Sequence, residues 1–384
     1  MGVEPGVIVP RTRGGTYDAG MTTPTRAPLR IPFADLWGMR IEHPYSLLVR
    51  AGGHAWTCGQ CPLAPDASVL TPDDLVGQAG PVEGYIRHLL DKAEYSPADV
   101  GKLVLYHALD EAAATDRLLS HFRSKFPGAI LMPVATPFFY YPGMRLEVDV
   151  HAAERRAPLV TRDEALGLRL QAVDADDLIW VSLEVLDPPQ GALDGDAVRD
   201  ALRAAVGVSA DALLADHWFV SGSGAGPTLD ALGQAGLVTD PGAAVGATLA
   251  PGVVAMGELT FAGGGAASLA TPAHPGVAIF ARSSRSHFWI AARSPSPALS
   301  VVGETQAIMA GIADTLRARG WSFESVCKAT THYVGSSSPA DLHDNMSVRN
   351  AYYRRPGPAS TGLPVAAFPL SSSQIAVDVL GMIE

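Results

Sequence analysis

A pattern that recurs three times along the chain limits its fold more than any other feature of the sequence. In each copy a serine opens a short turn, an apolar residue follows four positions later, and a run of strand-forming residues comes next. The serines are Ser96, Ser209 and Ser322, which lie 113 residues apart in both steps. One serine at the start of a helical turn is common, but three at equal spacing indicate an internal repeat of one structural unit.

The segments on either side of each serine agree with this interpretation. Before the third serine, Ile308, Ile312 and Leu316 recur at the spacing of an amphipathic helix. The corresponding helix of the first copy would begin near Pro81, because proline suits the first turn of a helix. After each serine we expect a strand, a second helix and two closing strands. The final strands are predicted at 146–150, 255–259 and 375–379.

The repeat predicts an α+β protein of three tandem units. We expect a disordered arm at 1–28, followed by units at 29–155, 156–270 and 271–384. The Gly263-Gly264-Gly265 run is typical of a linker before the third unit. A chain of 384 residues has room for two to four domains, so three units of this size are within the expected range.

Composition narrows the classes of function. The formal net charge of −11 argues against non-specific binding to nucleic acid, which needs an excess of Lys and Arg. We find neither a run of 18 apolar residues that predicts a membrane span nor a signal peptide within residues 1–32. Three cysteines are too few, and an odd number, for a disulfide scaffold, so we expect a cytoplasmic protein.

Two local patterns identify a family that the chain resembles. In the first unit, His43-Pro44-Tyr45 precedes Trp56-Thr57-Cys58-Gly59-Gln60-Cys61-Pro62. This is similar to the YjgF/RidA family, in which a G-P-Y turn precedes a strand that ends in S-G-Q-x-P. The third unit resembles the later half of the family at Asn345, Pro358-Ala359-Ser360-Thr361, Phe368-Pro369 and the strand that contains Asp378. The second unit is similar only in pattern.

The resemblance implies a fold and an assembly. Members of the family form homotrimers of a unit about a third of this length, each with a mixed, chorismate-mutase-like sheet backed by two helices. Their sheets face inward, and their ligand pockets lie at the interfaces. Three such units in one chain imply an intramolecular pseudo-trimer, which would be a monomer or a dimer of that monomer. Covalent linkage gives each unit a high effective concentration for the others.

The resemblance also implies a reaction. RidA-type members hydrolyse reactive imines and enamines, and they use an arginine to bind the substrate carboxylate and a glutamate on the last strand to help position water. Here Ser360 stands where that arginine would fall. The acidic position persists as Glu147, Asp378 and, by pattern, Glu258. Because a carboxylate in a partly dry pocket can act as a general acid or base, Glu147 and Asp378 are predicted as catalytic residues.

The predicted substrate-binding residues combine the family positions with two arginines that could replace the missing anion clamp. Each also has a purely structural interpretation, such as turn packing for Tyr45 or surface exposure for the arginines. Cys58 and Cys61 have C-x-x-C spacing but lack a second pair or nearby histidines, so we predict no metal and no cofactor. The substrate-binding residues are Tyr45, Cys58, Gly59, Gln60, Arg145, Arg293, Asn345 and Ser360.

Three functions remain open from the sequence. The first is an enzyme of specialised biosynthesis that performs proton-transfer or hydrolytic chemistry on an imine, enamine or enol-like metabolite. The second is a chorismatase-like enzyme that cleaves an enolpyruvyl ether, since chorismatases also resemble fused YjgF-type units with an acidic residue on the last strand. The third is a non-catalytic ligand-binding or scaffold protein. A small molecule is the expected partner in the first two.

Overall fold

The computed structural model describes residues 26–383 except 40, 111, 165–166, 188–192, 296–298 and 336–338. The predicted arm at 1–28 therefore lies almost entirely outside the described residues. The described part of the chain has six α-helices and two sheets, which confirms the predicted α+β class. None of these helices is long and apolar enough to cross a lipid bilayer. The helices are α1 (Leu75–Lys92), α2 (Ala112–Lys125), α3 (Gly195–Val206), α4 (Gly226–Gln234), α5 (Val301–Ala318) and α6 (Pro339–Asn350).

A twelve-stranded sheet has the order β13-β14-β15-β18-β16-β17-β2-β3-β6-β4-β5, with β1 (Leu29–Pro32) paired to β2. Its other early strands are β2 (Ser46–Ala51), β3 (His54–Thr57), β4 (Val100–Ala108), β5 (Ile130–Thr136) and β6 (Leu146–Ala153). Its late strands are β13 (Ser268–Ala270), β14 (Ala278–Ser283), β15 (His287–Arg293), β16 (Val326–Val334), β17 (Ala359–Val365) and β18 (Ile375–Met382).

A six-stranded sheet has the order β11-β10-β12-β9-β8-β7. Its strands are β7 (Val160–Glu164), β8 (Leu168–Ala175), β9 (Leu178–Leu186), β10 (Leu213–Val220), β11 (Val245–Gly246) and β12 (Val253–Ala262).

The same strand order occurs in three consecutive parts of the chain. The orders are β2-β3-β6-β4-β5, β8-β9-β12-β10-β11 and β14-β15-β18-β16-β17. The last two strands of each order pair in parallel, and a helix crosses between them, as parallel strands require. We call these three groups the first, second and third parts.

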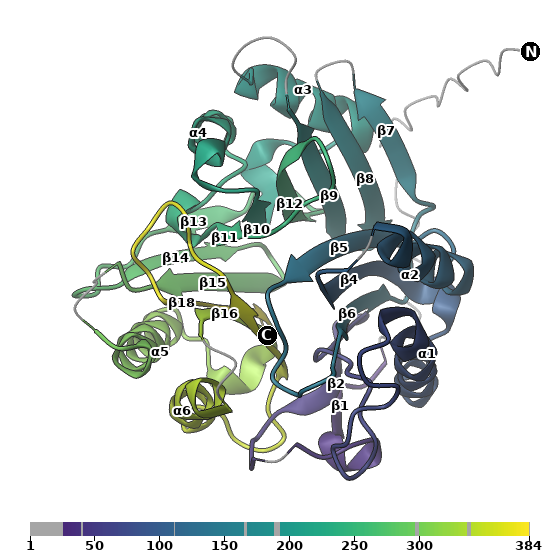
Figure 1. The fold of residues 1–384 in the computed structure, drawn as a ribbon. Helices are drawn as coiled ribbons and strands as arrows, with labels where there is room; N and C mark the ends of the chain where they lie inside the picture. The colour runs from purple at the N-terminus through teal and green to yellow at the C-terminus, as the bar shows by residue number, and fades with distance from the viewer. Residues whose placement is uncertain are drawn as a thin grey trace, which may run out of the picture.

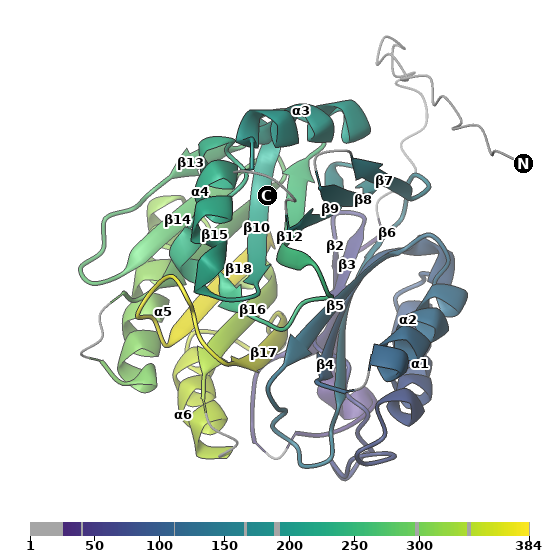
Figure 2. The ribbon, with the colours of Figure 1, turned by 45° about the horizontal axis from the view of Figure 1, so that its top comes forward.

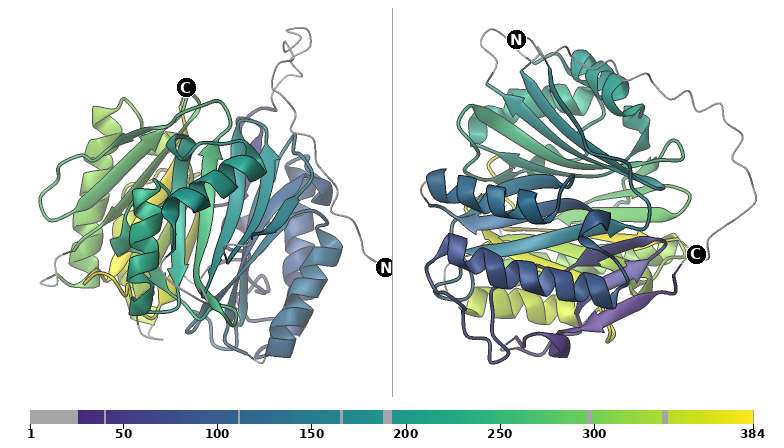
Figure 3. Two further views of the ribbon diagram at one scale, coloured as in Figure 1. Left: turned by 90° about the horizontal axis from the view of Figure 1, so that it is seen from above. Right: turned by 90° about the vertical axis from the view of Figure 1, so that its right-hand side faces the viewer.

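The strands of each part contact the next part in a cyclic pattern. β4 and β5 contact β8 and β9, β10 contacts β14 and β15, and β16 and β17 contact β2 and β3. Figure 1 shows the strands meeting in the interior while the helices lie outside, and Figure 2 and Figure 3 show the same arrangement from other sides. Strands, and not the outer helices, therefore make these contacts between parts.

Three tryptophans mark the correspondence between the parts. Strand pairing sets Trp56 opposite His151, Trp180 opposite Thr260 and Trp289 opposite Leu380. All three tryptophans are buried. They stand at the same place on β3, β9 and β15, where the sheet faces approach one another.

A single strand pair joins the first and third parts into one sheet. β17 and β2 pair in parallel at Ala359 and Ser46, and Ser46 N donates to Pro358 O over 3.0 Å. We call this junction the β2–β17 seam. Tyr45 precedes Ser46 and Ser360 follows Ala359, so the seam brings these two residues together.

The local predictions hold for the turns and need correction at one helix. Ser96, Ser209 and Ser322 each precede a 3-10 turn that leads into β4, β10 or β16. Helix α1, however, begins at Leu75 and not near Pro81, which lies inside it. The Asp74 carboxylate caps α1 by accepting a hydrogen bond from Gly77 N, and this cap fixes the start before the proline is reached.

Candidate functional site

Three carboxylates occupy the same place on β6, β12 and β18. Strand pairing sets Asp149 opposite Val104, Glu258 opposite His217 and Asp378 opposite Thr330. Each of the three partners stands eight residues after the repeated serine. The prediction that grouped Glu147 with Glu258 and Asp378 is therefore wrong by two residues. The loops before these strands differ in length, so the serine spacing does not fix the register.

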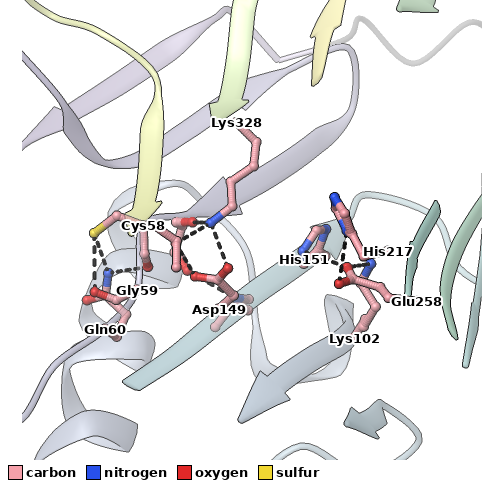
Figure 4. A network of polar contacts seen from close by, with 12 residues as sticks. Cys58, Gly59, Gln60, Lys102, Asp149, His151, His217, Glu258 and Lys328 are labelled. Carbon is pink, nitrogen blue, oxygen red and sulfur yellow. Dashed lines mark hydrogen bonds and ion pairs between the residues drawn. The ribbon is translucent and has the colours of Figure 1, made fainter. Parts of the chain in front are cut away.

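Two of these carboxylates form buried ion pairs with a lysine from another part of the chain (Figure 4). Lys328 Nζ lies 2.8 Å from Asp149 Oδ2, and Lys102 Nζ lies 2.5 Å from Glu258 Oε1. Both lysines stand six residues after the repeated serine. The Thr361 hydroxyl supports the first pair by donating to Asp149 Oδ1 and accepting from Lys328 Nζ, both over 2.6 Å. The two ion pairs occupy equivalent positions. The first joins the third part to the first part, and the second joins the first part to the second part.

The third place lacks the lysine. Ala215 stands there, and Asp378 instead pairs with His217, whose Nε2 lies 2.8 Å from Asp378 Oδ1. Burial opposes protonation of His217, but the carboxylates of Asp378 and Glu258 outweigh it and raise the pKa of His217 well above its usual value. An imidazolium therefore takes over the charge that the lysine supplies at the other two places.

A cavity of about 70 Å³ lies where β3 and β6 face α6 and β17. Its wall is mostly aromatic or sulfur-containing, and its polar groups come from both the first and the third part. The apolar side chains include Phe33, Trp37, Tyr140, Tyr141 and Met346. The polar side chains are Tyr45, Cys58, Cys61, Glu147, Arg349 and Ser360. We call this the Glu147 pocket.

Glu147 is buried at the wall of this pocket. Burial, together with the neighbouring Asp149 carboxylate, raises the pKa of Glu147 to about 8, although Lys328 acts in the opposite direction. Burial raises the pKa of Asp149 as well, but Asp149 contacts Lys328 directly, which favours its charged form, whereas Glu147 does not. Near neutral pH the pocket thus contains a protonated carboxylic acid.

Gly59 makes room for this acid. A Cβ atom at Gly59 would lie 1.7 Å from Glu147 Oε1, so no other residue fits beside the carboxyl group. The neighbouring Cys58 and Cys61 are free thiols, and burial raises the pKa of each well above its usual value. The Gln60 amide is turned away from the pocket and donates to Cys58 O over 3.0 Å. The missing side chain of Gly59 therefore leaves space for the Glu147 carboxyl group. The Gln60 amide stabilises the neighbouring backbone through its hydrogen bond to Cys58 O.

Arg349 of α6 is a candidate site residue that the sequence did not predict. It is buried and reaches the pocket from the third part. Its guanidinium donates to Asn345 Oδ1 through Nη2 (2.8 Å) and Nε (3.2 Å), and to Thr331 Oγ1 through Nη1 (3.0 Å). The family pattern suggests an arginine on the strand where Ser360 stands, whereas here the cation comes from the preceding helix. The i, i+4 spacing of Asn345 and Arg349 is the signal that was available.

Several predicted residues meet at this pocket. Tyr45, Cys58, Gly59, Glu147 and Ser360 all line it. Burial raises the pKa of Tyr45, an effect that the nearby Arg349 and Ser360 partly offset. Asn345 lies behind the pocket wall and orients the guanidinium.

Three other predicted residues lie elsewhere. Arg145 donates to Leu109 O and pairs with Asp110 at 3.2 Å. Arg293 pairs with Asp240 at 2.6 Å, between the second and third parts. Asp378 belongs to the same interface through its contact with His217. None of the three lines the Glu147 pocket: Arg145 turns to Asp110 of its own part, whereas Arg293 and Asp378 contact the second part.

A second cavity, of about 40 Å³, lies between the second and third parts and is lined by Trp289, His332 and Asp378. The positions that correspond to Glu147 in the third and second parts are Ala376 on β18 and Met256 on β12, as the strand pairing shows. Within the described ranges, the acid at this place occurs only in the Glu147 pocket.

No protein-family model matches the chain, and no curated protein matches it either. Among solved structures, the chain is similar to a crystal structure of chorismatase, with 14% identity over 74% of this chain and 93% of that chain and a TM-score of 0.49.

It is also similar to the Rid-family protein YyfB from Yersinia pestis, with 20% identity over 29% of this chain and 86% of that chain (TM-score 0.26). A putative endoribonuclease from Thermotoga maritima matches with 19% identity over 33% and 98% (TM-score 0.29). The sequence analysis named the same two kinds of protein, the YjgF/Rid family and, more distantly, chorismatase.

Proposed function

We propose that this chain is an enzyme built as an intramolecular pseudo-trimer of three Rid-like units, and that it hydrolyses a small carboxylated metabolite with an enol-type or enamine double bond. The Glu147 pocket is the active site. The observation that carries the proposal is a buried carboxyl group with a raised pKa, Glu147, enclosed in one pocket with the guanidinium of Arg349.

The proposed architecture rests on the threefold strand order and on the cyclic contacts between the parts. The units correspond approximately to 29–155, 156–270 and 271–384. β13 already pairs with β14, so we assign the segment from 268 onward to the third unit. The single chain supplies all three interfaces, and therefore we expect a monomer.

Arg349 is suited to bind a substrate carboxylate. Arginine presents five N–H donors in a rigid fork, of which Asn345 and Thr331 take three here. The remaining donors suit a carboxylate, and a charge-assisted hydrogen bond in a buried site is stronger than one in water. The flat aromatic side chains of Tyr140 and Tyr141 would cover a planar substrate.

Glu147 is suited to donate a proton. A general acid works best when its pKa lies near the pH of the reaction, and the pKa of Glu147 is raised to about 8. With an enol ether, the Glu147 proton moves to the terminal carbon of the double bond and leaves an oxocarbenium centre. Water adds to that centre and returns a proton to Glu147. The hemiketal then breaks its carbon–oxygen bond and releases an alcohol and a 2-oxo acid.

An enamine would follow the same steps and would release ammonia or an amine in place of the alcohol. Chorismate carries an enolpyruvyl ether and carboxylates, so it is the first substrate to test, with pyruvate as the product to measure. A 2-aminoacrylate-type enamine, generated in the assay, is the second, with ammonia release as the readout. The two assays separate the two branches of the proposal.

Glu147→Gln tests the acid directly. Gln has nearly the shape of protonated Glu, so the fold should persist while turnover falls by about 10²–10⁴-fold. The matched control is Glu42→Gln, because the Glu42 side chain is 96% exposed. Undiminished turnover in Glu147→Gln would exclude this residue as the acid. Lack of turnover and of ligand-induced stabilisation in the unaltered protein, over both substrate classes, would favour a scaffold.

A further inference from the structure

Three hairpin turns, one from each part of the chain, meet away from the Glu147 pocket. His54 is the first residue of β3, His287 is the first residue of β15, and Asp177 immediately precedes β9. Strand pairing sets His54 opposite Ala153 and His287 opposite Met382, which are corresponding places. The three turns therefore bring two imidazoles and one carboxylate together from positions far apart in the sequence.

The side-chain atoms converge. His54 Nε2 lies 3.5 Å from Asp177 Oδ1, and His287 Nδ1 lies 3.5 Å from Asp177 Oδ2. The three potential ligand atoms all lie within 4.8 Å of one another. The Ser286 hydroxyl adds a fourth donor atom, since it donates to Asp177 Oδ2 over 2.5 Å and lies 2.9 Å from His287 Nδ1.

The two separations of 3.5 Å between the imidazoles and Asp177 suit metal ligands better than hydrogen-bond partners. A nitrogen–oxygen hydrogen bond spans about 2.7–3.2 Å, so 3.5 Å is long for one. Two ligands about 2.0–2.1 Å from a tetrahedral zinc ion lie roughly 3.3 Å apart, close to the observed spacing. His54 Nε2 also lies 2.9 Å from Ala175 O, a carbonyl oxygen that can serve as a ligand when the coordination number is higher.

Burial supports the same interpretation. His54 and His287 are fully buried, whereas the Asp177 side chain is 39% exposed and offers an entry path for an ion. Asp177 Oδ1, one of the atoms that would bind the ion, is a buried atom without a hydrogen-bond partner among the described residues. Unsatisfied buried polar atoms are rare in folded proteins and call for an explanation.

We propose that His54, Asp177 and His287 form a divalent transition-metal site of the zinc type, with the Ser286 hydroxyl, the Ala175 carbonyl or water completing the coordination. Imidazole and carboxylate ligands suit such ions. Because the three ligands come from the three parts, the ion fastens the parts together. Its role is structural and does not depend on the reaction at Glu147.

Metal binding to the full-length, untagged protein tests this proposal. After removal of metals with a chelator, ZnCl₂ is titrated by calorimetry and the melting temperature is followed. We expect one ion per chain and a rise in melting temperature with zinc. Co²⁺ should bind in its place and give visible absorption bands typical of an ordered site.

Variants assign the ligands. Asp177→Asn and His287→Gln should each weaken zinc binding at least about tenfold. Asp176→Asn is the matched control, because Asp176 is adjacent but pairs with Arg155 at 2.9 Å, and its zinc affinity should not change. Asp177→Asn alters a half-exposed side chain and should fold even if His287→Gln does not.

The proposal is overturned by an absence of saturable binding, or by equal zinc affinity in Asp177→Asn and the unaltered protein. Loss of binding in Asp176→Asn but not in Asp177→Asn would overturn it as well. Glu147→Gln should bind zinc normally, so this test and the test of the proposed reaction can fail independently.

Discussion

Glu147 and Asp149 stand two residues apart on β6 and face the same side, yet their surroundings differ, although burial raises the pKa of both. Asp149 contacts Lys328 and Thr361, which favour its ionised form. Glu147 has no such cation at contact distance among its described partners, and Gly59 packs directly against its carboxyl group. The environment of each residue, and not its identity, separates a carboxylate in an ion pair from the acid that we propose for catalysis.

The raised pKa of Glu147 makes stability depend on pH. The folded protein holds this proton up to about pH 8, whereas the unfolded chain releases it near 4.5. Between these values the folded state binds more protons, so the free energy of unfolding should fall as the pH rises. Glu147→Gln removes this contribution. Urea unfolding of both proteins at about pH 5, 7 and 8.5 should therefore show the variant gaining relative stability as the pH rises. Parallel pH profiles would contradict the raised pKa.

Arg349 allows a second test at the level of one residue. Arg349→Lys keeps a positive charge but loses the fork, so we expect kcat/KM for a carboxylated substrate to fall at least about tenfold, or about 1.4 kcal/mol. The methyl ester of the same substrate should be much less affected. Arg354→Lys is the control, since the Arg354 side chain is 88% exposed. An equal loss with acid and ester would mean that Arg349 only supports the fold.

The sequence predicted part of this site because some residues belong to a short local motif. Tyr45 and Gly59 could be named in this way, and Glu147 from its place on the predicted final strand of the first unit. Arg349 could not, because it approaches from a helix of another part, and the family pattern directed attention to Ser360. The sequence also could not predict which acidic residues of β6, β12 and β18 correspond. That correspondence depends on strand pairing, and the loops before these strands differ in length.

At the scale of elements, β4 and β16 each insert a lysine into the neighbouring part, and this placement explains why Lys102 and Lys328 are buried. Polar residues of this kind disturb the apolar pattern of a strand read alone. They become understandable only when the opposing carboxylates are known. Turns and helices were more predictable, because the repeated serines and the apolar spacing act locally.

The Lys328–Asp149 pair should be costly to break from one side. Lys328→Met leaves a buried carboxylate without its cation, and we expect a loss of about 3–5 kcal/mol in the free energy of unfolding. Lys92→Met removes an exposed partner of Asp35 and should cost about 0–1 kcal/mol. Urea denaturation of both variants measures the difference. A loss below about 1 kcal/mol in Lys328→Met would show that the pair does not hold the parts together.

At the scale of the whole molecule, the equal serine spacing was enough to predict the repetition but not how the parts join. The spacing treats the three parts alike, whereas the structure merges the first and third into one twelve-stranded sheet and leaves the second as a sheet of six. That difference arises at Ser46 and Ala359, whose pairing carries no distinctive sequence signal.

The proposed closed arrangement predicts the state of the protein in solution. One chain supplies every interface that a homotrimer would build from three, so we expect sedimentation as a single species of about 40.1 kDa. Sedimentation velocity over a range of concentrations checks this. A stable trimer of chains would contradict the arrangement.

The β2–β17 seam has a consequence for how the Glu147 pocket keeps its shape. Tyr45 and Ser360 adjoin backbone atoms that are hydrogen-bonded across the seam, so the main chain sets the span between two walls of the pocket. The aromatic lining can therefore vary in size and polarity while that span stays constant. Replacing the lining side chains can therefore change which ligands the pocket accepts, while the backbone distance between Tyr45 and Ser360 stays the same.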